Sequence, residues 1–128
     1  MKQNVTLRIA SVLSLLLLTI HLADDVVRGM FPPGIEVFYA GLASGALLYG
    51  ILALADRRSG LVVMLFVSLF AMAMPFLHTR GAGLAKSAAS SGGFFFVWTL
   101  IALGMTGAFS FILSLIAFGP RRSGEPRQ

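Results

Sequence analysis

Two short segments contain the residues of this chain that could do chemistry. They hold His21, Asp24, Asp25 and Arg28 in the first segment, and His78 and Arg80 in the second. On a helix, His21 and Asp25 would share one face, and Asp24 and Arg28 would have the spacing of an ion pair. Imidazole and carboxylate groups are ligands for divalent metal ions, so His21, Asp25 and His78 are the candidate metal ligands.

The same groups are compatible with other roles. Histidine titrates near neutral pH, so the cluster could relay protons. Arg28 and Arg80 could bind an anionic headgroup or substrate, and a haem could use His21 and His78 as ligands. A purely structural role remains open, because charged side chains near a membrane surface can pair at low cost. None of these spacings is diagnostic of catalysis, so the sequence assigns no catalytic residue and requires no cofactor.

Composition indicates the kind of element that must position these residues. Of the 128 residues, 57% are hydrophobic and only 12% are charged, about half the ~25% of an ordinary soluble domain. Mean hydropathy is +0.88. So few charged side chains cannot cover the surface of a small soluble protein. The chain has no cysteine, which excludes disulfides and cysteine-ligated metal or iron–sulfur sites. Composition therefore predicts a polytopic membrane protein.

Four apolar segments are long enough to cross a bilayer, which takes ~20 residues in a helix. They span residues 5–23, 35–55, 61–77 and 94–118. We therefore expect an all-α fold and a single domain, with four transmembrane helices in an antiparallel bundle and a mobile polar tail at 119–128. Cleavage of the first segment as a signal peptide is disfavoured, because a cut after Ala23 would place His21 where a small residue is required.

Basic residues predict the orientation. Seven of the ten fall at the N-terminus, between the second and third segments, or in the tail: Lys2, Arg8, Arg57, Arg58, Arg121, Arg122 and Arg127. The positive-inside rule then predicts that both termini lie on the cytoplasmic side. We expect the membrane to be the plasma (inner) membrane. The two histidines fall at the outer ends of their segments. The basic balance follows from topology and implies no nucleic-acid partner.

Small residues predict where helices approach one another. They recur at helical spacing at Gly41, Gly45, Gly104, Ala108, Ser110 and Ser114. Such stripes allow close packing in lipid, either within one chain or between copies. The aromatic run Phe94–Phe96 with Trp98 is typical of an interfacial belt or of core filling.

These patterns leave three functions open. The first is a non-enzymatic subunit or assembly factor of a membrane complex, with the bilayer and either further copies or other membrane subunits as partners. The second is a small transporter or channel with an outer His/Asp/Arg vestibule. The third is a redox protein that binds a metal or haem through His21 and His78.

Overall fold

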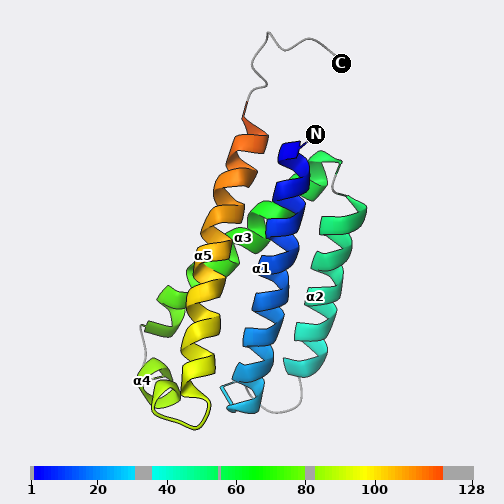
Figure 1. Cartoon of the computed structure of the whole chain (residues 1–128). Coiled ribbons are helices and arrows are strands. Elements are labelled where there is room, and N and C mark those ends of the chain that lie inside the picture. Colours follow the sequence, from blue (N-terminus) through cyan, green and yellow to red (C-terminus); the bar gives the residue numbers. More distant parts are fainter. Residues whose placement is uncertain (1, 31–35, 55, 80–82, 120–128) are drawn as a thin grey trace, which may run out of the picture.

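The computed structural model describes residues 2–30, 36–54, 56–79 and 83–119. Within these ranges every regular element is a helix and none is a strand, so the all-α prediction is confirmed. The helices are α1 (Lys2–Val27), α2 (Glu36–Ala53), α3 (Arg58–Thr79), α4 (Gly83–Ala88) and α5 (Gly93–Phe118) (Figure 1). The candidate residue Arg80 lies outside the described residues, as do residues 120–128 of the expected tail.

Three helices are long and apolar enough to cross a membrane: Val5–Val27, Arg58–Thr79 and Gly93–Phe118. They correspond to the first, third and fourth predicted segments. The second predicted segment contains α2, in which the described apolar stretch is the shorter Ser44–Ala53. The structure thus supports a helical membrane protein with three candidate spanning helices.

Two helix boundaries differ from those expected, and both differences affect the candidate site. Helix α1 continues to Val27, past the predicted end at residue 23, so Asp25 lies on a regular helix rather than in a loop. Helix α4 occupies part of the predicted 78–93 loop. Gly92 then begins α5 with a φ of 78°, a left-handed conformation that glycine adopts without steric cost.

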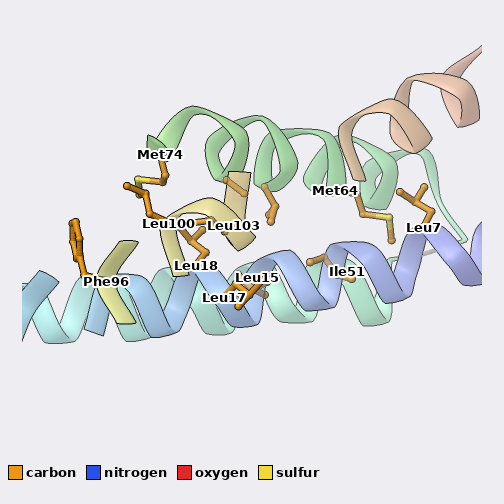
Figure 2. Close-up of a cluster of buried hydrophobic side chains, with 12 residues drawn as sticks. Leu7, Leu15, Leu17, Leu18, Ile51, Met64, Met74, Phe96, Leu100 and Leu103 are labelled. Atoms are coloured by element: carbon orange, nitrogen blue, oxygen red, sulfur yellow. The ribbon is translucent and has the colours of Figure 1, made fainter. Parts of the chain in front are cut away.

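The buried apolar core lies between α1, α3 and α5, with Ile51 contributed by α2. Figure 2 shows leucines of α1 facing Leu100 and Leu103 of α5 and Met64 and Met74 of α3, with Phe96 at one end of the cluster. Large apolar side chains also cover much of the exterior. A continuous apolar exterior would aggregate in water, but it fits a lipid surrounding.

Helices α3 and α5 approach most closely at glycines. A Cβ atom on Gly107 would lie 2.6 Å from the Met72 backbone nitrogen, and one on Gly104 would lie 2.7 Å from Cγ of Pro75. Only residues without side chains permit this separation. The expected packing role of Gly104 therefore corresponds to a real contact, and Gly107 is a further contact residue that the sequence analysis did not single out.

The other small residues of the predicted packing stripes differ in burial and in the contacts they make. Ser110 hydrogen-bonds through its hydroxyl to that of Ser11 at 2.9 Å, which joins α5 to α1. Ser114 is buried, and Ala108 is half-buried. A Cβ atom on Gly41 or Gly45 would meet nothing within 4 Å. These two glycines make no close contact with the described chain, and a contact between copies through them stays a prediction.

Candidate metal centre

The candidate ligands come from the ends of two helices. His21 and Asp25 lie one turn apart near the C-terminal end of α1, and His78 lies in the last turn of α3. The i,i+4 spacing places His21 and Asp25 on the same face of α1. Both are buried, with 0% and 2% of their surfaces exposed. The fold therefore brings together three residues from segments more than fifty positions apart.

Their polar atoms converge on one point. Nε2 of His78 lies 3.3 Å from Oδ2 of Asp25, and Nε2 of His21 lies 3.9 Å from the same oxygen. One ligand atom from each residue can be chosen so that all lie within 4.8 Å of one another. We call His21, Asp25 and His78 the His-Asp centre.

Hydrogen bonds to the other ring nitrogens determine where the imidazole protons lie. Nδ1 of His21 is 3.2 Å from the Thr99 hydroxyl, which itself donates to the Phe96 carbonyl at 3.0 Å. The hydroxyl proton is therefore committed, and His21 must donate from Nδ1. Nδ1 of His78 donates to the Met74 carbonyl at 3.0 Å. A neutral imidazole carries one proton, so in the neutral rings both Nε2 atoms present lone pairs to Asp25.

With both rings neutral, no described residue supplies a proton donor between the two Nε2 atoms and the Asp25 carboxylate. Two Nε2 lone pairs face a carboxylate, and all of these groups are acceptors when the rings are neutral. Among the described residues, Nε2 of His21 and Oδ1 of Asp25 are buried without a hydrogen-bond partner. Burial of such atoms without a partner is costly. A cation or an added proton at this point would satisfy all three groups.

Aromatic contacts shield the centre. The ring centroids of His21 and His78 are 4.9 Å apart in an edge-to-face arrangement. The buried Phe96 ring packs against both, at 5.0 Å from His21 and 5.5 Å from His78. Phe94 and Trp98, in contrast, are 84% and 52% exposed. The aromatic run thus divides into one core residue beside the centre and outward-facing neighbours.

Asp24 and Arg28 form a structural connection beside the centre. Nε of Arg28 donates to Asp24 at 2.7 Å, and its Nη atoms donate to the Ser90 hydroxyl at 2.5 Å and the Gly92 carbonyl at 3.1 Å. The guanidinium also lies 5.2 Å from the Phe96 ring centroid. These contacts tie the end of α1 to the start of α5. Asp24 and Arg28 are therefore engaged with each other and with α5, whereas Asp25 faces the histidines.

The core role expected for the aromatic run holds for Phe96, but its place beside the histidines was not predicted, and neither were the contacts of Thr99 and the Met74 carbonyl. Thr99 is 78 positions from His21, and no local pattern connects them. Comparison with known proteins does not identify the centre: no family model matches the chain, and searches of curated proteins and of solved structures found no relative. Its chemistry is therefore inferred from the geometry alone.

Proposed function

We propose that this chain is an integral membrane protein that binds a divalent transition-metal ion in the His-Asp centre. One observation carries the proposal: the Nε2 atoms of the buried His21 and the half-buried His78 converge on the buried Asp25 carboxylate, and their Nδ1 atoms are already hydrogen-bonded elsewhere. A metal cation is the ligand that this arrangement of acceptors fits, since metal ligands must be deprotonated.

The hydrogen bonds at the Nδ1 atoms of His21 and His78 are of the kind found around metal-bound histidines. A metal-bound histidine commonly donates its second ring N–H to a carbonyl, carboxylate or other acceptor, which fixes the ring and its tautomer. His21 does so to Thr99, and His78 does so to Met74.

The donor set restricts the metal. Two nitrogens and one oxygen suit Zn²⁺ and other divalent first-row ions such as Fe²⁺. Tetrahedral ligands at about 2 Å from an ion lie roughly 3.3 Å apart. The separations of 3.3 Å and 3.9 Å from Asp25, within a set of ligand atoms that all lie inside 4.8 Å, require the three groups to close further around an ion. Three protein ligands leave one coordination position open, as in metal sites that bind water or a substrate.

Haem fits the site less well. A macrocycle ligated by both histidines would have to lie between rings that already touch edge to face. The vestibule expected for a transporter is not favoured either, because His21 and Asp25 are buried and Arg28 is held by three partners. The role of subunit or assembly factor stays a prediction that no particular contact favours.

We further propose four membrane crossings in an antiparallel bundle. Asp25 near the end of α1 meets His78 at the end of α3, and Arg8 near the start of α1 bonds to Asp56 just before α3. Helices α1 and α3 therefore run in the same direction, and the chain between them must return. Helix α2, at 18 residues and about 27 Å, nearly matches the ~30 Å hydrocarbon thickness. The basic residues then favour cytoplasmic termini in a plasma membrane.

Metal content of the purified chain tests the proposal. We expect one equivalent of a divalent ion by elemental analysis, or one zinc site by titration of metal-free protein. Each ligand should be needed for zinc binding. Loss of a contact outside the ligand set costs roughly 10- to 100-fold in affinity, and we expect a larger loss in each of the ligand variants His21→Gln, His78→Gln and Asp25→Asn.

The matched control is Asp24→Asn, which removes the neighbouring carboxylate on the same helix turn and should leave zinc affinity within a few-fold of the wild type. Circular dichroism would verify that each variant remains helical. Folded wild-type protein that binds no zinc, or equal affinity in the wild type and the three ligand variants, would reject the metal centre.

A further inference from the structure

A second feature adjoins Asp24 and Arg28 and is lined by none of the three residues of the His-Asp centre. It is a cleft of about 830 Å³ between the end of α1, helix α4 and the start of α5. Its lining includes Asp24, Arg28, Lys86, Ser91 and Phe95. The volume falls within the ~300–1,000 Å³ typical of small-ligand sites.

The polar part of the cleft favours an anion. Asp24 is neutralised by Arg28 through the 2.7 Å hydrogen bond. Lys86 is exposed and, among the described residues, takes part in no ion pair. The lining therefore carries one uncompensated positive charge. Ser91 adds an exposed hydroxyl to the lining, whereas the Ser90 hydroxyl is bonded to Arg28 and to the Ser87 carbonyl.

The backbone adds donors to the same place. Gly92 caps α5 without a side-chain hydrogen bond. Of the first-turn amides, that of Gly93 donates to the Ser90 carbonyl at 2.9 Å, which leaves those of Phe94 and Phe95 available within the described chain. Such amides favour negative charge, because they also form the positive end of the helix dipole. This contribution supplements Lys86, the cationic side chain of the lining that is not paired with a described carboxylate.

The remaining lining is apolar. Val27 and Phe95 are 85% and 45% exposed, and Met30 is also exposed. Val27 is the last residue of α1, and Phe95 lies in the first turn of α5. The cleft therefore lies where the apolar helices end, at the depth at which headgroups meet hydrocarbon. A ligand that fits both halves has an anionic group attached to an apolar body.

We propose that this cleft binds the phosphate group of an anionic phospholipid, with Lys86 as its cationic contact and Val27 and Phe95 beside its acyl chains. Basic residues at a membrane surface bind anionic headgroups in this way. The proposal depends on the membrane location of the chain and is independent of metal binding at the His-Asp centre.

Lipid binding to the full chain in a neutral detergent tests this. Phosphatidylglycerol should bind more tightly than phosphatidylcholine, as measured by native mass spectrometry. Lys86→Gln should weaken phosphatidylglycerol binding roughly fivefold. Ser91→Trp adds bulk to the cleft without changing charge and should also weaken it.

The matched control is Arg57→Gln, which removes an exposed basic residue at the other end of the molecule and should have no effect on this binding event. Equal losses in Lys86→Gln and Arg57→Gln would overturn the proposal in favour of general surface charge. A Lys86-dependent response to inorganic phosphate alone, read as a shift in thermal unfolding, would assign the cleft to a soluble anion and overturn the lipid. Wild-type binding that does not distinguish the two lipids would also overturn it.

Discussion

At the scale of single residues, Thr99 has the clearest separable role. Its hydroxyl donates to Phe96 and must therefore accept the Nδ1 proton of His21. This arrangement turns Nε2 of His21 toward Asp25. Thr99 thus positions a ligand without contributing one, and its effect should appear in metal affinity rather than in folding.

Replacement of this hydroxyl should weaken metal binding selectively. Thr99→Val keeps the shape but removes the acceptor, so we expect zinc affinity to fall by about 10- to 100-fold, the usual effect of an outer-shell contact. Titration of the metal-free variant with zinc measures this.

Two controls separate positioning from packing. Thr99→Ser retains the hydroxyl and should restore most of the affinity. Thr106→Val removes a hydroxyl on the same helix that bonds to the Ala102 carbonyl, so it should leave zinc binding unchanged. If Thr99→Val binds zinc as tightly as the wild type, the hydroxyl does not orient His21.

At the scale of helices, the approach of α3 to α5 determines where His78 lies relative to α1. Gly107 sits at the closest point, with its would-be Cβ 2.6 Å from backbone of Met72. Backbone cannot move aside as a flexible side chain can. A methyl group here must push the two helices apart, and α3 carries His78 at its end.

Gly107→Ala should therefore destabilise the protein although alanine is the better helix former. We expect a loss of about 1–3 kcal/mol in the free energy of unfolding, the usual cost of overpacking. Unfolding by a denaturing detergent, followed by circular dichroism, measures it.

Gly45→Ala is the matched control, because the same added methyl group would meet nothing within 4 Å of the described chain. It should leave stability unchanged or slightly raised, since alanine has the higher helix propensity. Equal stability of both variants would show that the α3–α5 contact is looser than the structure has it. A loss confined to Gly45→Ala would indicate a contact between copies through that face.

At the scale of the whole molecule, the relative directions of the helices limit the possible membrane topologies. The contacts of α1 with α3 make the two helices parallel, while the Ser11–Ser110 and His21–Thr99 pairs make α1 and α5 run in opposite directions. If α1, α3 and α5 all cross the bilayer, α2 must cross it too. With the cytoplasmic termini proposed above, the His-Asp centre would lie toward the outer leaflet.

Because the chain has no cysteine, single substitutions can report this topology without background. Met30→Cys and Ser91→Cys should react with a membrane-impermeant maleimide added to intact cells, and Ser59→Cys should react only after permeabilisation. Labelling of Met30→Cys and Ser59→Cys from the same side would exclude a crossing by α2. The inverse pattern for all three would contradict cytoplasmic termini.

Much of the local structure follows from the sequence alone. Helices were predicted for the apolar segments from their length of about 20 residues, since a helix satisfies its backbone hydrogen bonds within one segment. The His21–Asp25 pair follows from helical spacing, and His78 was the one other histidine available. The extension of α1 to Val27 and the presence of α4 were not predicted. The aspartates after residue 23 and the glycines and serines after residue 80 have only weak helix propensity.

The sequence therefore determined that the chain is helical and apolar, and which few residues could bind a cation. Only the tertiary structure decided that Asp25, rather than Asp24, faces both histidines, and that Thr99 and Phe96 surround them. It also decided that Gly107 rather than Gly45 lies at a helix contact. The physical reason is that the rotation and offset of packed helices depend on side chains distant in sequence, which no local periodicity specifies.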